Sequence, residues 1–455
     1  MDHIKNYKLT KIFRMPSDGV LNEKLLNEFI QANINITQVK YKPLDRAYNN
    51  DYEIFHLPKK EYWKPDNRIA VNFAKYITDT FNSFFIGNPI KVNCEDKAVR
   101  ETIEFIDSYN NQDDNNAELS KTMSIFGRAY EMYYIDAAGE IGIVNTTPME
   151  SFMIYDDSVL TRKKYFVRYY LDANGNLRGS FSDNRNVTYF RYKSGCRGQM
   201  YIYKRKKAHG FDDVPAAEYI ENAERMGIFE SVMSLIDAYN KALSEKANDV
   251  DAFADAYMKI IGPGVETKDM VNIRSNRIIN FETDGEIPAD VDFLARPSAD
   301  TTQENLLNRL YKDIFIISMV ANVSDENFAT SSGIALKYKM SAMNNMFGFK
   351  RRKFTAGLNQ RYKIIFSNPV VRVPKDAWLL PKFVFTPNYP ANIVDEAETA
   401  AKLAGITSKE TQLSVLSIVD DPNAELERIE AEQDLMGNDT DGFNINRTID
   451  TESGE

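Results

Sequence analysis

Residues 228 to 261 read IFESVMSLIDAYNKALSEKANDVDAFADAYMKII, and these 34 residues include neither glycine nor proline. An unbroken helix of this length would extend for about 50 Å, at about 1.5 Å per residue. The average helix of a globular protein has only about three to four turns. The stretch therefore predicts a long helix that projects from the body of the protein.

Apolar side chains of this helix recur every seven residues, a spacing typical of helices that pack along one another. One series is Phe229, Ile236, Leu243, Val250 and Tyr257, and the second, interrupted by Lys246, is Val232, Tyr239, Phe253 and Ile260. A single partner helix cannot cover both series, so we expect the first one to be a seam between several copies of the chain. The acidic residues Glu245 and Asp249 belong to the face that is left over.

A sharp break follows this helix at Gly262, Pro263 and Gly264. Residues 262–301 form a small island with strand-like runs at 271–273, 277–281 and 291–294 and a hairpin signal at Asp284-Gly285. A second helix is predicted over 302–321, with Thr301 and Thr302 as candidate N-caps. These segments together predict a helical hairpin, here called the stem, with a small β-rich domain at its tip.

A polar loop at 322–333 and a long basic helix at 334–362 come next. The loop contributes Asn322, Ser324, Asp325, Glu326, Asn327, Phe328, Thr330 and Ser331, and the helix contributes Lys337, Lys339, Lys350, Arg351, Arg352 and Lys353. No acidic residue occurs between Glu326 and Asp376. Because a solvated helix usually mixes both signs of charge, this segregation favours a negatively charged partner close to the helix.

The region before the stem predicts a mixed α/β domain. Helices are expected at 21–33, at 66–87 with Asp66 as N-cap, and at 117–126, and the remainder of residues 1–60 is expected to be a poorly ordered arm. Strands are expected at 130–135 and 141–145, followed by a β-meander at 151–155, 164–171, 187–192 and 200–204. Two further strands, at 370–373 and 382–385, are expected to complete this domain.

The end of the chain is acidic. From Ala391 onward there are 16 acidic and 4 basic residues, whereas the whole chain of 455 residues has a formal net charge of −10. Residues 391–436 predict three short acidic helices, and the Asn- and Asp-rich tail from 437 to 455 predicts disorder.

Several classes of site are disfavoured by the composition. The two cysteines, Cys94 and Cys196, and the three histidines, His3, His56 and His209, have no spacing that suits a zinc site or a catalytic triad. The acidic pairs Asp156-Asp157 and Asp212-Asp213 suit turns better than metal sites, and no phosphate-binding loop or kinase motif occurs. No apolar stretch of about 18 residues predicts a membrane span. We therefore predict a non-enzymatic protein without a metal or cofactor.

Several runs of residues resemble those of a known family. They are NRIAVNFAKYI at 67–77, GNPI at 87–90, SLIDAYN at 234–240, ANDV at 247–250, Asn327-Phe328 with SGIALKYK at 332–339, and LAGITSKET at 403–411. In their order and spacing, over about residues 20–432, the chain resembles the portal proteins of tailed bacteriophages, of the long-tailed type common in Gram-positive hosts.

The resemblance implies a predominantly helical α+β portal fold, assembled as a ring of about twelve subunits at one capsid vertex of the virion. It implies a wing at 1–225, a stem at 226–261 and 302–321, a clip at 262–301, a tunnel loop at 322–333, a basic helix with wing strands at 334–390 and a crown at 391–436. The implied partners are double-stranded DNA in the central channel, the terminase large subunit, a head–tail adaptor, and the major capsid and scaffolding proteins. Assembly in the host cytoplasm and no contact with a membrane are implied as well.

Two alternatives fit parts of the sequence. The acid-free basic stretch would also suit a monomeric nucleic-acid-binding protein or nuclease, and a minor structural head protein without a channel would share the helical patterns. In a channel, the acidic residues Glu245 and Asp249 would repel the duplex and let it slide, because many lysines would bind phosphates tightly.

Overall fold

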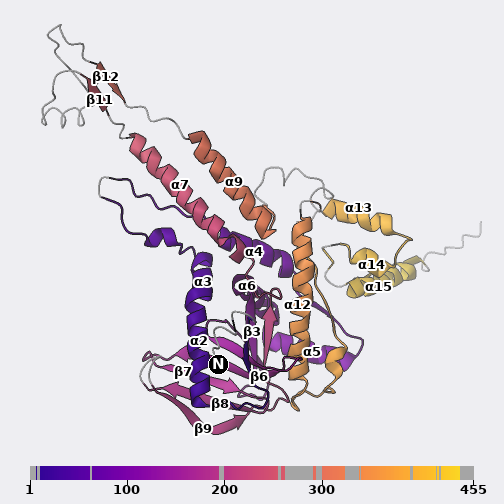
Figure 1. Cartoon of the computed structure of the whole chain (residues 1–455). Helices are drawn as coiled ribbons and strands as arrows, with labels where there is room; N and C mark the ends of the chain where they lie inside the picture. The colour runs from indigo at the N-terminus through magenta and orange to yellow at the C-terminus, as the bar shows by residue number, and fades with distance from the viewer. Residues whose placement is uncertain are drawn as a thin grey trace, which may run out of the picture. The chain divides into compact units, whose positions relative to one another are not determined.

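A computed structural model describes residues 7, 11–61, 64–193, 199–254, 258–261, 290–293, 300–322, 338, 340–389, 393–416, 418–419 and 422–440 (Figure 1). The chain is a mixture of α and β structure and divides into two units. The first comprises Met1–Asn322 and Met340–Pro387, and the second comprises Val323–Lys339 and Asn388–Glu455.

Two sheets form the body of the first unit. A six-stranded sheet has the order β1-β5-β6-β7-β8-β9, in which β1 runs parallel to β5 and all other neighbours are antiparallel. Its strands are β1 (Phe13–Met15), β5 (Ser151–Asp156), β6 (Lys163–Leu171), β7 (Leu177–Ser182), β8 (Asn186–Tyr192) and β9 (Met200–Ala208). A three-stranded antiparallel sheet has the order β10-β3-β4, with β3 (Arg128–Ile135), β4 (Ile141–Thr146) and β10 (Ala216–Ile220).

A small apolar cluster joins the two sheets. Met153 and Phe166 come from the six-stranded sheet, Tyr130 and Ala216 from the three-stranded sheet, and all four are buried. The predicted strands of this region are confirmed, whereas β1 and β10 were not predicted. The meander also contains an additional strand that was not predicted, β7. Its sequence, LRGSFS, carries a glycine and three polar residues and therefore lacks a clear strand signal.

The first of the N-terminal helices packs against the six-stranded sheet. These helices are α2 (Glu23–Ile36), the π-helical turn η1 (Thr37–Tyr41), α3 (Lys42–Tyr48) and the 3₁₀ turn η2 (Glu53–His56). Asn33 of α2 donates to the hydroxyl of Tyr169 at 2.9 Å, and Tyr192 donates to the side chain of Asn27 at 2.6 Å. The predicted helix at 21–33 is confirmed, whereas the poorly ordered arm is wrong for residues 37–56, because apolar residues such as Tyr41 and Leu44 are buried here.

Two helices precede β3. They are α5 (Lys97–Tyr109), which was not predicted, and α6 (Gln112–Phe126), which begins earlier than predicted. The passage from α6 to β3 depends on Gly127, whose φ is +79°. A Cβ atom at this position would lie 2.2 Å from the carbonyl oxygen of Arg225, so only glycine fits.

Helix α4 (Phe73–Ile86) begins seven residues later than predicted. Its N-cap is Asn72, whose side chain accepts a hydrogen bond from the backbone N–H of Lys75 at 3.1 Å. The prediction that Asp66 caps this helix is wrong, because several backbone N–H groups between residues 66 and 72 donate to side chains of another helix, as described below.

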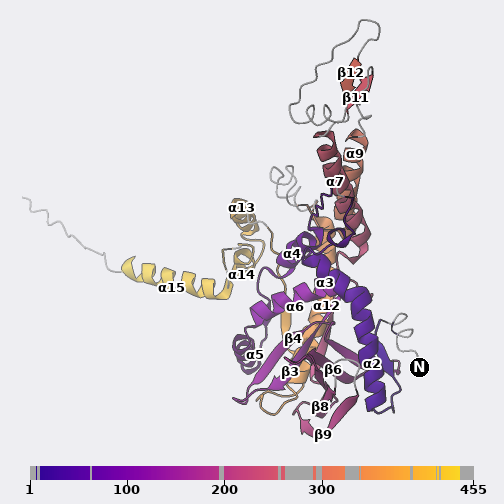
Figure 2. The ribbon, with the colours of Figure 1, turned by 90° about the vertical axis from the view of Figure 1, so that its left-hand side faces the viewer.

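The basic region forms helix α12 (Ser341–Ile365), which is labelled in Figure 2. This helix packs against β10. Residue 338 is also helical. After α12 come η4 (Ala377–Leu379) and β13 (Lys382–Val384), and β13 pairs with β2 (Lys91–Asn93). The strand predicted at 382–385 is thus confirmed. The strand predicted at 370–373 is wrong, because Asn368 begins a turn in which its carbonyl accepts from Val371 at 3.1 Å.

The stem consists of η3 (Glu230–Val232), α7 (Met233–Ala254) and α9 (Asp300–Ser318), and α7 and α9 lie side by side (Figure 1). The prediction that the first stem helix reaches residue 261 is wrong. Residues Met258–Ile261 form strand β11, which pairs with β12 (Asp290–Phe293) so that Ile260 lies opposite Val291. β-Branched residues favour such pairing. The strand predicted at 291–294 is confirmed, and those at 271–273 and 277–281 lie outside the described residues.

In the part of the second unit that is described from residue 393 onward there are three helices, as predicted. They are α13 (Ile393–Leu403), α14 (Lys409–Leu413) and α15 (Pro422–Thr440). Ser408 caps α14 by accepting from the backbone N–H of Thr411. Helix α15 continues past residue 437, where the tail was predicted to begin, and residues 441–455 lie outside the described part.

The contact between α12 and β10 can be tested at two glycines of the same helix. A Cβ atom on Gly357 would lie 2.3 Å from the ring of Tyr219, whereas one on Gly348 would meet nothing within 4 Å. We expect Gly357→Ala to lower the free energy of unfolding by about 1–3 kcal/mol through overpacking. The matched control Gly348→Ala is expected to raise it by up to about 1 kcal/mol, because alanine favours a helix. Urea unfolding of both variants measures the difference, and equal effects would contradict the packing.

Candidate functional site: the stem and the segment docked on it

One side of helix α7 changes from apolar to polar along its length. Val232 and Ile236 at its base are buried, and the next positions at a spacing of four are Asn240, Ser244 and Asn248. These three polar residues are also buried, with 1%, 2% and 6% of their surface exposed. Buried polar side chains require hydrogen-bond partners, and here the partners come from a distant segment of the chain.

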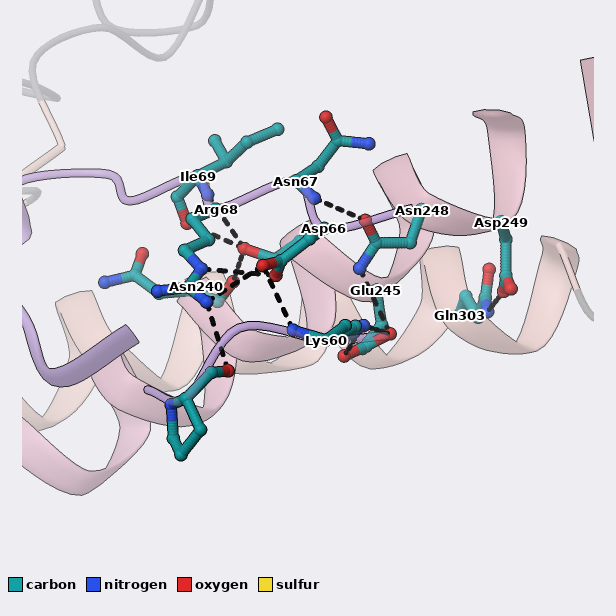
Figure 3. A network of polar contacts seen from close by, with 12 residues as sticks. Lys60, Asp66, Asn67, Arg68, Ile69, Asn240, Glu245, Asn248, Asp249 and Gln303 are labelled. Atoms are coloured by element: carbon teal, nitrogen blue, oxygen red, sulfur yellow. Dashed lines mark hydrogen bonds and ion pairs between the residues drawn. The ribbon is translucent and has the colours of Figure 1, made fainter. Parts of the chain in front are cut away.

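An extended segment at residues 66–71, here called the strap, lies along this polar side (Figure 3). The backbone N–H of Asn67 donates to Asn248, that of Ile69 donates to Ser244, and that of Val71 donates to Asn240, at 2.6, 2.9 and 2.8 Å. The hydroxyl of Ser244 also donates to the carbonyl of Ile69 at 3.0 Å.

The repeat distances of the two elements explain this register. Alternate residues of an extended chain are about 6.6 Å apart, and residues four apart on a helix are about 6 Å apart. Every second N–H of the strap therefore meets every fourth residue of α7. The three side chains of α7 thus accept hydrogen bonds from the strap, as the carbonyl groups of a neighbouring β-strand would.

The loop that leads into the strap is held by Arg68. Its guanidinium donates to the carbonyls of Phe55 at 3.1 Å, Leu57 at 2.9 Å and Pro58 at 3.1 Å, and it pairs with Asp66 at 2.9 Å. One planar side chain thus binds three carbonyls and fixes residues 55–58 beside the start of the strap.

A charged contact closes the far side of the loop. Lys60 binds Glu245 of α7 with both distances at 2.9 Å, and this hydrogen bond lowers the pKa of the Glu245 carboxyl (Figure 3). Asp249, one turn further, accepts from Gln303 of α9 at 2.7 Å. The acidic stem face predicted at Glu245 and Asp249 stays a prediction, and within the chain Glu245 carries a counter-ion while Asp249 joins the two stem helices.

The two stem helices are joined by further polar and aromatic contacts. Lys246 of α7 pairs with Glu304 of α9. Near the base, Tyr239 of α7 and Tyr311 of α9 both contact the ring of Phe73, at centroid distances of 5.1 and 5.8 Å. Phe73 is the first residue of α4, so the end of the strap and the hairpin share one aromatic cluster.

The predicted seam divides into two parts. Phe229 and Ile236 are fully buried within the chain and Leu243 is half-buried, whereas Val250 is 62% exposed. Tyr257 lies outside the described residues. Burial of the seam between copies of the chain stays a prediction. Within this chain, only the seam residues at the base of the helix are fully buried.

The basic helix has one buried and several exposed cations. Lys350 is 1% exposed, pairs with Glu221 at 2.9 Å, and donates to Ser124 Oγ at 2.6 Å and to the carbonyl of Ser120 at 3.1 Å. Burial lowers the pKa of Lys350 and raises that of Glu221. The prediction that Lys350 serves an external partner is wrong, because it is enclosed by α6 and by the residues after β10.

The neighbouring cations remain at the surface. Arg351 and Arg352 are exposed, and Lys353 is half-buried. Lys337 and Lys339 lie outside the described residues, as does the predicted tunnel loop apart from Asn322, which donates to the hydroxyl of Tyr311 at 2.8 Å. The roles assigned to Ser324, Asp325, Glu326, Asn327, Phe328, Thr330 and Ser331 therefore stay predictions.

A second buried cation of α12 was missed. Arg361 pairs with Glu131 of β3, with 2.9 Å between Nε and Oε2, and donates to Asn116 of α6 at 2.6 Å. Tyr133 and Tyr219 donate to the same carboxylate at 2.9 and 2.7 Å. A lone acid in the predicted strand at 130–135 was the available signal, because a charge on a buried strand needs a partner.

Neither a metal centre nor a membrane span is found in the part that the structure describes. No group of three or more His, Cys, Asp or Glu side chains there could hold a metal ion. No helix among the described residues combines the length and the apolar character needed to cross a membrane.

The strap and the stem lie within a range of the chain that matches a known family. The family described as "Phage portal protein, SPP1 Gp6-like" matches residues 28–435. The chain belongs to this family. It is therefore a portal protein of the tailed-phage type, as the resemblance implied, and this membership favours the portal interpretation over the two alternatives.

Individual portal proteins are similar over most of their length. The portal protein of Bacillus phage SPP1 is 24% identical over 410 residues, which cover 82% of this chain and 78% of that protein. The portal protein of Clostridium phage phiCD119 is 24% identical over 368 residues, covering 75% of this chain and 79% of that protein. Among solved structures, a chain of "Neck of empty GTA particle computed with C6 symmetry" is 8% identical, with a TM-score of 0.44, and the match covers 84% of this chain and 93% of that one.

The strap can be tested at Ser244. Ser244→Ala removes the acceptor of the Ile69 N–H, and an unsatisfied buried donor costs about 1–3 kcal/mol. We expect faster hydrogen exchange in peptides that cover residues 66–72 of this portal protein, measured by mass spectrometry. Ser234→Ala, at an exposed position of the same helix, is the control and should leave the exchange unchanged. Equal exchange in both variants would show that the strap is held by other contacts.

The buried pair of α12 gives a second prediction. Lys350→Met leaves Glu221 buried without a counter-ion, and we expect a loss of about 3–5 kcal/mol in the free energy of unfolding. Arg351→Met, at the adjacent exposed position, should change it by less than about 0.5 kcal/mol. Adding Glu221→Leu to Lys350→Met should recover most of the loss. Denaturant unfolding measures the free energy of unfolding of all three variants. A small loss in Lys350→Met would show that Lys350 and Glu221 are accessible to water.

Proposed function

We propose that about twelve copies of this chain form a ring at one vertex of a phage capsid, and that double-stranded DNA enters and leaves through its centre. Family membership supports this proposal. So does the stem, a projecting hairpin of the kind that can pack side by side with copies of itself around an axis.

The observation that carries the proposal is the apolar surface that the stem leaves uncovered in a single chain. On α9 and just after it, Leu306, Ile316, Ile317 and Met319 are 51%, 70%, 50% and 42% exposed. On α7, Val250 is 62% exposed. Exposed aliphatic residues on a long helical hairpin are typical of a surface that another chain covers.

The strap gives the stem a defined base in this proposal. It is bonded to the middle of α7 and continues directly into α4 of the wing. A hairpin that is bonded along its length to the body of its own subunit changes its tilt less readily than one attached at its base alone. The channel would therefore keep its width while DNA moves through it.

The proposal changes the role of the stem acids. Because Glu245 is paired with Lys60, its charge is largely compensated at short range. Reversing it to lysine would break the loop of Lys60 as well as remove a negative charge. Repulsion of the duplex by the stem is better assigned to the sum of its acidic residues than to Glu245 alone.

The remaining parts are assigned by the family's organisation. We propose that the clip, residues 262–301, docks the terminase large subunit during packaging and a head–tail adaptor afterwards. The loop at 322–333 would contact DNA in the channel, and the helices of the second unit would form the crown inside the capsid. The wing would contact the major capsid and scaffolding proteins. Assembly would take place in the host cytoplasm, and the ring would become part of the virion.

Ring assembly can be tested at the exposed aliphatic surface of α9. Ile316→Asp places a charge in the proposed contact between subunits, where an unpaired buried charge costs several kcal/mol. We expect negative-stain images and native mass spectra to show monomers or incomplete rings. Asn308→Asp adds the same charge at an exposed polar position of the same helix and should leave complete rings. If both variants form complete rings, this surface lies outside the interface, and if the unmodified chain stays monomeric, the proposed function is wrong.

A further inference from the structure

The region from residue 163 to residue 208, which forms β6 to β9, is strongly basic. It holds 12 lysines and arginines and only two acidic residues, Asp172 and Asp183. One of these is used locally, since Asp172 pairs with Arg178 at 2.6 Å. The region therefore has a formal net charge of +10 in a chain whose total is −10.

The cations are arranged in rows across one face of the sheet. Tyr170 of β6 lies opposite Arg178 of β7, Arg178 lies opposite Arg191 of β8, and Arg191 lies opposite Tyr201 of β9. Residues that are directly opposite in neighbouring strands share a face. The row therefore crosses four strands and consists of two tyrosines and two arginines, all of them exposed.

Adjacent residues extend this face. Arg168 lies opposite Ser180, and Ser180 lies opposite Tyr189, which is 50% exposed. The guanidinium of Arg191 lies 5.8 Å from the ring centres of both Tyr201 and Tyr203. Such cation–π contacts restrain a guanidinium that is itself exposed.

Strand β9 forms the edge of the sheet and adds four consecutive cations, Lys204, Arg205, Lys206 and Lys207. All four are exposed, and none of them forms an ion pair with another described residue. Lysines on an edge strand often serve only to prevent the pairing of strands from different molecules. That explanation does not cover the two arginines of the row, Arg178 and Arg191, which lie on the interior strands β7 and β8.

The composition of this face favours a nucleic acid over a protein partner. Protein interfaces are depleted of charge at their centre, whereas here the charges occupy the middle of the face. Arginine, lysine and tyrosine are the residues that contact phosphates. Strand β9 is about 30 Å long at about 3.4 Å per residue, and a duplex of that length carries about 18 phosphates.

We propose that the exposed face of β6–β9 and the edge of β9 bind the phosphate backbone of double-stranded DNA, without regard to sequence and outside the central channel. The inference rests on the proposed function in one respect, that the chain operates next to double-stranded DNA. It adds a second place of contact, on the wing, that could hold the duplex near the ring while the channel conducts it.

A closed circle of DNA separates this surface from the channel, because a circle cannot be threaded through a ring that has already assembled. We would measure the binding of relaxed circular duplex to purified assembled rings by gel shift, at 50 to 200 mM salt. The test variant carries Lys204→Gln, Arg205→Gln, Lys206→Gln and Lys207→Gln. The control variant loses the same charge at four exposed positions elsewhere in the first unit, Lys42→Gln, Lys59→Gln, Arg372→Gln and Lys382→Gln.

We expect unmodified rings to bind the circle, and the test variant to bind it more than about tenfold more weakly. Its plot of log K against log salt should be less steep by about 3 to 4, since each lost phosphate contact removes about 0.9 from the slope. The control variant should bind within about twofold of the unmodified ring. Negative-stain images of each sample confirm that rings are present, so a failure of ring assembly is recognised separately.

Three results would overturn the inference. In the first, both variants weaken binding equally, which would show a response to net charge alone. In the second, linear duplex binds to the rings and the circle does not, which would confine DNA to the channel. In the third, a labelled polyglutamate peptide binds to the unmodified ring and loses its affinity in the test variant while the circle does not bind. The surface would then serve an acidic protein.

Discussion

Two cations buried along helix α12 hold this helix against the three-stranded sheet, close to the start of the stem. Arg361 is bound to Glu131 in the three-stranded sheet, and Lys350 is bound to Glu221 just after that sheet. A buried ion pair adds little net stability, but leaving one partner alone costs several kcal/mol, so the pairs select one position of the helix along its axis and one rotation. Glu221 precedes the base of the stem, and its N–H donates to the carbonyl of Gly127 at 3.0 Å. The same few residues therefore fix α12, the sheet and the start of the stem.

In the proposed ring, one side of helix α7 packs against its own chain and another side faces other copies of the chain. At its base, Val232 and Ile236 are buried as in any packed helix. Further along, Asn240, Ser244 and Asn248 replace the apolar residues on that side, because the strap presents backbone N–H groups instead of a hydrophobic surface. The strap, bound to these three polar side chains, thus covers one side of α7 without a second layer of helices. The opposite side, which includes Val250, is left for neighbouring subunits.

The periodic elements could be predicted from the sequence, and the contacts that position them could not. The meander, the stem hairpin and the three C-terminal helices follow from alternation, heptad spacing and turn residues. The end of α7 was overestimated, because the heptad series continues through Ile260 while pairing with β12, which is distant in sequence, makes that segment a strand. The hydrogen bonds between the strap and α7 were not predicted, because Asn240, Ser244 and Asn248 interrupt the apolar pattern. Asn or Ser at every fourth position was the available signal. The strap was read as helix because Ile69 and Phe73 share helical spacing, and its hydrogen bonds lie about 170 residues away.

Several charged residues of the stem are paired within the chain, whereas the cations of strand β9 are not. This difference favours separate roles for the two regions in contact with DNA. On the stem, Glu245 is bound to Lys60, Lys246 to Glu304 and Asp249 to Gln303, so these polar groups are occupied within the chain. A wall whose charges are already paired offers few sites for phosphates, which suits a surface past which a duplex must slide. On the wing, the cations of β9 have no such partners among the described residues. Any lasting hold on DNA would therefore come from the sheet, and the path through the ring would stay nearly free of it.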